Sequence, residues 1–140
     1  MKKFVYILIV LALVGGVVWL IMTPGKPGKY DQFAQCLTDK GVKFYGAFWC
    51  PHCQAQKARF GKSVRLLPYI ECSTPDGQGQ LPICKDVGVT TYPTWDFPPG
   101  LDATASTSLR ANDASTTTVR VVGELELSDL AEKTSCTLPQ

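Results

Sequence analysis

The stretch Trp49-Cys50-Pro51-His52-Cys53 carries two cysteines separated by two residues, and no other part of the chain says as much about the fold. An apolar run over 42–49 precedes the pair and predicts a buried strand, and a polar run over 54–60 follows it and predicts a helix. Proline suits the first position of a helix, where its missing N–H would have no partner, so Cys50 is expected at the N-cap. There its sulfur would face unpaired amides and the positive end of the helix dipole, which stabilise a thiolate.

An uncharged apolar run occupies residues 4–22 near the N-terminus. At about 1.5 Å per residue, a helix of this length can cross a hydrocarbon core of roughly 30 Å. A cleaved signal peptide is the alternative, but its apolar core is usually about 7–15 residues long and ends at a small-x-small site. We therefore expect an uncleaved transmembrane anchor over 4–22, with a cytoplasmic tip over 1–3 and a linker rich in proline and glycine over 23–29.

The six cysteines and the charge of the chain indicate its surroundings. Because these cysteines lie outside any repeated zinc-type spacing in one small domain, they suit an oxidising compartment better than the cytosol. Lysines on both sides of the apolar run leave only a small positive-inside bias. Together these features place the C-terminal domain on the extracytoplasmic side of the cell membrane, periplasmic or extracellular. The net charge of +2, with acids and bases interspersed, gives no reason to expect a nucleic-acid partner.

Residues 30–140 are predicted to form one domain in which helices and strands alternate. Helices are expected over 31–40, 51–60 and 81–87, and a last one with Ser128 as its N-cap and Asp129 in its first turn. Strands are expected over 42–48, 68–71, 94–97 and 118–122. The stretch over 98–117 has little apolar content and predicts a long exposed loop that joins a hairpin. This order predicts an α/β fold, a mixed sheet with helices on both faces.

Four segments, taken in order, resemble the thioredoxin-like domain attached to bacterial vitamin K epoxide reductase homologues. They are Phe33-Ala34-Gln35-Cys36-Leu37, Tyr45-Gly46-Ala47-Phe48-Trp49-Cys50-Pro51-His52-Cys53, Cys84-Lys85-Asp86-Val87-Gly88 and Tyr92-Pro93-Thr94-Trp95. The resemblance covers about 30–97 and, more loosely, the final helix. It implies a thioredoxin fold. It also implies, as in the periplasmic DsbA oxidases that share Cys-Pro-His-Cys, the transfer of disulfides to secreted proteins.

The resemblance implies roles for individual residues. Cys50 would be the exposed, attacking sulfur and Cys53 the buried, resolving sulfur, with Pro51 at the helix start. Pro93 matches the cis-proline that lies beside the dithiol in this family. His52 sits between the two cysteines, where its ring can give the Cys50 thiolate a hydrogen bond or a positive charge. Stabilising the reduced thiolate makes the disulfide more oxidising, so a histidine here favours an oxidant over a reductant.

Two features depart from the family. Its membrane part is a bundle of several helices with cysteines of its own, whereas this chain has one span. Reoxidation would therefore need a separate quinone-linked membrane oxidase, of the vitamin K epoxide reductase type or DsbB-like. Phe44 stands six positions before the first cysteine, where thioredoxin and the DsbA oxidases usually carry an acidic residue that accepts a proton from the buried thiol. The sequence names no replacement for that acceptor.

Four further cysteines lie outside the dithiol. The family domain carries an extra pair similar to Cys72 and Cys84, so we expect a structural disulfide between them, worth about 3 kcal/mol in the chain-entropy model. Cys36 and Cys136 would then be left. The first and last helices of a thioredoxin fold lie on opposite faces of the sheet, which argues against a bond between them. Free or intermolecular thiols are the alternative.

The favoured function is that of a membrane-anchored disulfide oxidase that acts on thiol-containing secreted proteins and needs no cofactor or metal. An anchored reductase or isomerase would use the same chemistry and stays open. A zinc-binding module would need two close ligand pairs, and Cys72 and Cys84 are far apart in sequence. A non-catalytic anchored adaptor with the same fold would have no need for an intact Cys-Pro-His-Cys.

Overall fold

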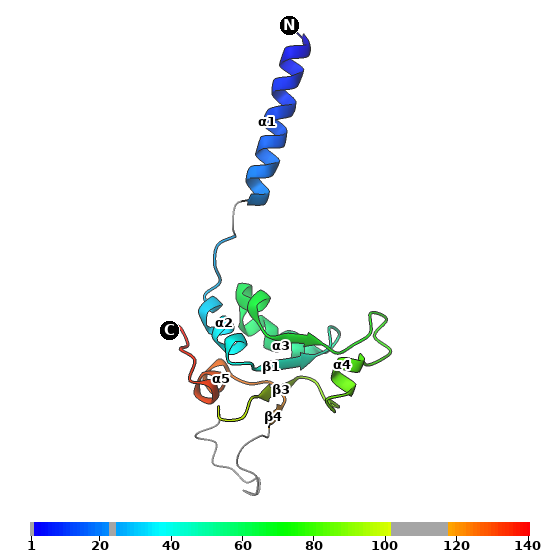
Figure 1. Cartoon of the computed structure of the whole chain (residues 1–140), viewed down its shortest axis with the longest axis vertical. Helices are drawn as coiled ribbons and strands as arrows, with labels where there is room; N and C mark the ends of the chain where they lie inside the picture. Colours follow the sequence, from blue (N-terminus) through cyan, green and yellow to red (C-terminus); the bar gives the residue numbers. More distant parts are fainter. Residues whose placement is uncertain (1, 23–24, 102–117) are drawn as a thin grey trace, which may run out of the picture.

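The structure, a computed structural model, describes residues 2–22, 25–101 and 118–140. Most of the expected loop over 98–117 lies outside these described residues. Figure 1 shows one long N-terminal helix followed by a domain in which shorter helices surround a small sheet. The elements of this domain alternate between helix and strand, in the order that the sequence predicts.

Helix α1 (Lys2–Met22) contains the whole apolar run. Its segment Lys3–Met22 has a mean hydropathy of 2.8, and none of the side chains in the most apolar window is buried. A helix of this length and composition serves proteins as a membrane anchor or as a signal sequence.

A four-stranded mixed sheet forms the centre of the domain, in the order β2-β1-β3-β4. The strands are β1 (Lys43–Gly46), β2 (Tyr69–Glu71), β3 (Thr94–Phe97) and β4 (Val119–Val122), each within two residues of its expected bounds. β1 and β2 run parallel with Phe44 opposite Tyr69, whereas β3 is antiparallel to both β1 and β4. The predicted α/β class is confirmed, and the architecture is that of a thioredoxin-like fold.

The helices of the domain are α2 (Asp31–Asp39), α3 (Pro51–Arg59), α4 (Pro82–Lys85) and α5 (Leu127–Thr134). A 3-10 helix, η1 (Gly61–Leu66), follows α3 directly and was not expected. The prediction of Ser128 as an N-cap is wrong, because α5 begins two residues earlier than expected and has Glu126 at its N-cap. Leu127, the first residue of α5, packs against the larger core, so the helix starts at the apolar residue rather than after the serine. Asp129 lies in the first turn as predicted.

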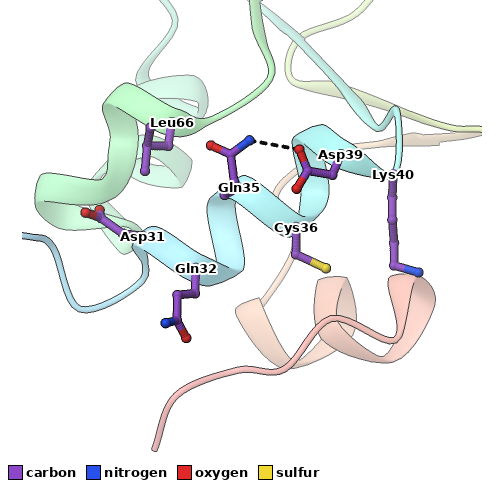
Figure 2. Close-up of a pocket in the computed structure, with 7 residues that line it drawn as sticks. All are labelled: Asp31, Gln32, Gln35, Cys36, Asp39, Lys40 and Leu66. Atoms are coloured by element: carbon purple, nitrogen blue, oxygen red, sulfur yellow. Dashed lines mark hydrogen bonds between the residues drawn. The ribbon is translucent and has the colours of Figure 1, made fainter.

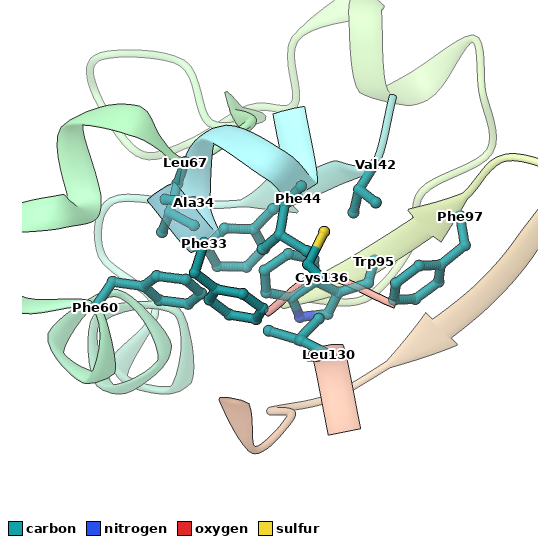
Figure 3. Packing of buried hydrophobic residues seen from close by; sticks show 11 residues of the cluster. Phe33, Ala34, Val42, Phe44, Phe60, Leu67, Trp95, Phe97, Leu130 and Cys136 are labelled. Atoms are coloured by element: carbon teal, nitrogen blue, oxygen red, sulfur yellow. The ribbon is translucent and has the colours of Figure 1, made fainter. Parts of the chain in front are cut away.

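Alternating side chains of β1 face two separate cores, so helices cover both faces of the sheet. Phe44 stacks on Trp95 with ring centroids 4.3 Å apart in the larger core, which Figure 3 shows. Helix α2 gives Phe33 to this core, and α5 gives Leu130. On the other face, Tyr45 packs with Cys72, Cys84 of α4 and Val89.

The expectation that Cys36 and Cys136 do not pair is wrong. They form a disulfide with a Cα–Cα distance of 6.0 Å. In this chain α2 and α5 pack on the same core rather than on opposite faces of the sheet. Ser135 has left-handed backbone angles, with φ +54°, and turns the chain back after α5 so that Cys136 meets α2.

A second disulfide joins Cys72, which follows β2, to Cys84 of α4, with a Cα–Cα distance of 5.6 Å. These are the two cysteines that the resemblance implied as a pair. Inside the loop that they close, Ser73 and Gln80 form an antiparallel β-bridge. The bond and the bridge together fix the chain beside the carboxyl end of β2.

Removing each disulfide should destabilise the full chain by an amount that follows loop length. The separations of 100 and 12 residues correspond to about 4.7 and about 3 kcal/mol in the chain-entropy model. We therefore expect the C36A/C136A variant to lose more free energy of unfolding than the C72A/C84A variant. Urea unfolding in detergent micelles measures both, and a larger loss from opening the short loop would contradict this expectation.

Candidate active site

The two cysteines of the dithiol lie where the sequence places them, at the start of α3. Cys50 is the N-cap with extended backbone angles, and Pro51 takes the first helical position. Both sulfurs are unpaired, so the structure shows the reduced form of the dithiol. The turn from β1 is closed by a hydrogen bond that the Cys50 N–H donates to the Ala47 carbonyl, 3.0 Å away.

Cys50 is buried in this structure rather than exposed as the resemblance implied. The residue is 5 % exposed, and its sulfur is 3.8 Å from the carbonyl oxygen of Tyr92, to which the thiol donates. The Tyr92–Pro93 peptide bond is cis, as the resemblance implied. The neighbouring Trp49 packs edge-on against the Tyr92 ring and is about half exposed.

Cys53 lies beneath Cys50 and has no exposed surface. Burial raises the pKa of its thiol to about 12, and the hydrogen bond with Cys50 acts in the same direction. A hydrogen bond with the Ala47 backbone and the charge of Lys57 act against this rise in pKa. At neutral pH the reduced Cys53 is therefore a neutral thiol that stays protonated until a partner takes its proton.

Gly46, at the end of β1, makes room for the buried sulfur. A Cβ at this position would lie 2.8 Å from Cys53 Sγ and 2.9 Å from Cε2 of Tyr69. Both distances are shorter than any normal contact of a Cβ, so a larger residue would displace the sulfur or the ring. The absence of a side chain at Gly46 thus brings Cys53 and Tyr69 together.

His52 is exposed, and its ring faces a residue that the sequence did not indicate. Its Nδ1 lies 2.7 Å from Glu124 Oε1, and Arg59 donates to the other oxygen of Glu124 at 3.3 Å. These two hydrogen bonds lower the pKa of Glu124, and the one with His52 has the larger effect. With Nδ1 facing Glu124, an effect of His52 on Cys50 must come through Nε2 or through the charge of the ring, and that effect stays a prediction.

Gln56, one turn after Cys53, fastens α3 to the segment that precedes α5. Its side chain is fully buried. It donates to the Leu125 carbonyl at 3.0 Å and accepts from the Leu125 N–H at 2.7 Å. Both polar ends of the buried amide are satisfied, so the pair holds the helix that carries the dithiol in place.

A group of polar residues that the sequence analysis missed lies at the carboxyl end of β2. Glu71 accepts hydrogen bonds from the N–H groups of Phe48 and Ser73, and its Oε2 accepts from the Tyr69 hydroxyl at 2.7 Å. The amino group of Lys57 lies over the Tyr69 ring, 3.2 Å from its centroid. Lys57 follows Cys53 by four residues in α3, a spacing that places the two side chains on one face of the helix.

No group of three or more histidine, cysteine or acidic residues that could hold a metal ion occurs in the part of the chain that the structure describes.

Comparisons with known proteins give two kinds of relative. Thiol-disulfide oxidoreductase LTO1 of Arabidopsis thaliana is 37 % identical over 112 residues, which cover 76 % of this chain and 24 % of the relative. Protein disulfide-isomerase A2 of Homo sapiens and that of Pongo abelii are each 37 % identical over 60 residues, 40 % of this chain and 11 % of the relative. No protein-family model matches. The chain thus spans a quarter or less of each relative, and the matches support a thioredoxin-like oxidoreductase domain.

Replacing Gly46 should disturb the dithiol from below. We expect G46A to lower the free energy of unfolding by about 1–3 kcal/mol, because the new methyl group overlaps Cys53 and Tyr69. Urea unfolding of the full chain measures the loss. The control is G25A, since nothing lies within 4 Å of a Cβ at Gly25. Equal stability of the two variants would show that the pocket around Cys53 has space to spare.

Proposed function

We propose that the chain is a membrane-anchored thiol–disulfide oxidoreductase that donates disulfides to secreted proteins. The observation that carries this proposal is the unequal placement of two free cysteines at one helix N-terminus. Cys50 caps the helix and keeps 5 % of its surface exposed, whereas Cys53 has no exposed surface and a raised pKa. Exchange chemistry needs one sulfur that a partner can reach and one that resolves the mixed disulfide.

The reaction starts from the Cys50–Cys53 disulfide. A substrate thiolate attacks Cys50 Sγ, the bond between the two cysteines breaks, and Cys53 leaves with the electron pair and gains a proton. A second thiolate of the substrate then attacks its own sulfur in the mixed disulfide and releases Cys50 as a thiolate. The substrate gains a disulfide, and the reduced site, with Cys50 as a thiolate and Cys53 as a thiol, holds two electrons that a membrane oxidase must remove.

The surroundings of Cys50 suit an extended polypeptide as substrate. Phe48 and Trp49 are 48 % and 49 % exposed, and they offer apolar surface directly beside the sulfur. Trp49 is held in place because its Nε1 donates to Ser73 Oγ at 2.8 Å. Such a surface fits unfolded segments, which present apolar side chains near their cysteines, better than a small polar thiol.

Helix α1 would anchor the domain at the extracytoplasmic side of the membrane, within reach of a quinone-linked oxidase of the vitamin K epoxide reductase type or a DsbB-like one. Two structural disulfides in the domain support an oxidising compartment. An anchored reductase or isomerase is the second candidate, since a stretch of 60 residues in this chain is similar to protein disulfide-isomerase A2.

Removing the resolving sulfur should trap the substrates. In C53A the mixed disulfide through Cys50 has no internal partner, so we expect covalent complexes to accumulate in cells that express the full chain. Non-reducing electrophoresis followed by mass spectrometry identifies the attached proteins. The control is the C50S/C53A variant, which should trap nothing. Complexes of equal yield in this control would place the attacking sulfur elsewhere.

The reduction potential separates the two candidate functions. Equilibration with glutathione should give the dithiol a potential above the roughly −270 mV of thioredoxin. H52A should move it toward more negative values, because the ring no longer stabilises the reduced thiolate, with about 30 mV for each 1.4 kcal/mol lost. K62A is the matched surface control, since Lys62 is exposed and lies outside the site. A wild-type potential near that of thioredoxin would favour the reductase.

A further inference from the structure

The buried Cys53 must gain or lose a proton in every cycle, and Phe44, six positions before Cys50 on β1, offers no acid or base. Phe44 stacks on Trp95 and meets the edge of the Tyr69 ring at a centroid distance of 5.2 Å, so the strand supplies aromatic carbon at this point. We propose that the amino group of Lys57 exchanges the proton of Cys53, with Tyr69 and Glu71 holding it in place. This inference rests on the exchange activity proposed above.

The geometry brings Lys57 and Cys53 close to one aromatic ring, that of Tyr69. Cys53 Sγ and Cε2 of Tyr69 both lie within 3 Å of the point that a Cβ on Gly46 would occupy. The amino group of Lys57 lies 3.2 Å from the centroid of the same ring. Since Lys57 follows Cys53 by four residues in α3, both side chains project from one face of the helix.

Burial shifts the pKa values of Lys57 and Cys53 in opposite directions. It lowers the pKa of Lys57, whereas it raises the pKa of Cys53 to about 12. The charges of Glu71 and of an ionised Cys53 raise the pKa of Lys57 again. These shifts favour the transfer of a proton from the Lys57 ammonium group to a Cys53 thiolate, which is the direction in which Cys53 is the leaving group; the same path is followed backwards when Cys53 attacks.

The neighbouring groups hold the lysine but do not replace it. Burial, and then the hydrogen bond to Glu71, raise the pKa of Tyr69 far above its usual value, so its hydroxyl stays protonated and keeps donating to Glu71. The Glu71 carboxylate accepts three hydrogen bonds, two of them from backbone N–H groups. Among the described residues, the charged or titratable groups that shift the pKa of Cys53 are Cys50 and Lys57. Those that shift the pKa of Lys57 are Glu71 and Cys53.

The proton moves with the disulfide chemistry. When a substrate thiolate attacks Cys50, Cys53 leaves as a thiolate and takes a proton from the Lys57 ammonium group, which becomes a neutral amine. In the reverse direction the neutral amine removes the proton from Cys53, and the Cys53 thiolate attacks Cys50 and expels the substrate thiolate. Lys57 recovers its initial state by exchange with water, so no further reactant is needed.

The test is a rapid-mixing experiment on the reduced full chain in detergent micelles with glutathione disulfide, followed by acid quenching and mass spectrometry. In the wild type the Cys50–glutathione mixed disulfide should be resolved too fast to accumulate. In K57M the resolution step should slow by at least about tenfold at pH 7.5, because general acid–base catalysis is lost. The rate of the resolution step in K57M should begin to rise at a higher pH than the rate in the wild type.

Two further variants separate proton exchange from simple charge. K57R keeps a cation over the Tyr69 ring, but a guanidinium cannot give up its proton, so we expect K57R to be slow as well. K62M removes an exposed lysine outside the site and should behave as the wild type. Resolution by K57M at the wild-type rate across pH 6–9 would overturn the proposal, and full rescue by K57R would assign Lys57 an electrostatic role instead.

A measurement without substitution guards against variants that fold poorly. Nuclear magnetic resonance titration of labelled lysines in the wild-type chain should show Lys57 titrating below its ordinary value and shifting when the dithiol is oxidised. An ordinary titration that is the same in both redox states would overturn the proposal. A wild-type chain that fails to react with glutathione disulfide at all would instead reject the proposed function.

Discussion

Everything in this site depends on keeping the sulfur of Cys53 out of water, three residues after the cysteine that caps the same helix. Cys53 lies against Gly46 and the Tyr69 ring, where burial holds it as a thiol. Cys50 caps the same helix, beside the Tyr92 carbonyl. A single turn of helix therefore separates the two sulfurs, and the proposed chemistry follows from the place of Cys50 at the N-cap and of Cys53 in the interior with a raised pKa.

The rest of the domain fixes the two positions. The carboxyl ends of the parallel strands β1 and β2 lie side by side, and they bring the dithiol turn next to Glu71. Gln56 and Glu124 tie α3 to the chain before α5. Two disulfides close the opposite sides of the fold, Cys36–Cys136 over the larger core and Cys72–Cys84 over the smaller one. Figure 2 shows Cys36 on α2, projecting toward the C-terminal segment, in an open pocket of about 540 Å³ that lies away from the dithiol.

Local patterns were sufficient to predict the strands, the place of the dithiol at a helix start and the Cys50 N-cap, because each depends on neighbours in the sequence. Contacts between distant segments were not accessible in this way. The Cys36–Cys136 bond was missed because the face that α2 covers is set by packing of Phe33 and Leu130 into one core. Glu71 and Glu124 were missed because their contacts depend on strand register and on the path of the chain after β4. Lys57 alone carried a local signal, its spacing from Cys53.

The most direct test of this account is competitive alkylation of the reduced full chain at neutral pH, with mass spectrometry of the cysteine peptides. The account predicts that Cys50 reacts first and that Cys53 is protected by at least about tenfold, a protection that unfolding in urea removes. Alkylation of Cys53 as fast as Cys50 in the folded chain would contradict the division of roles between the two sulfurs.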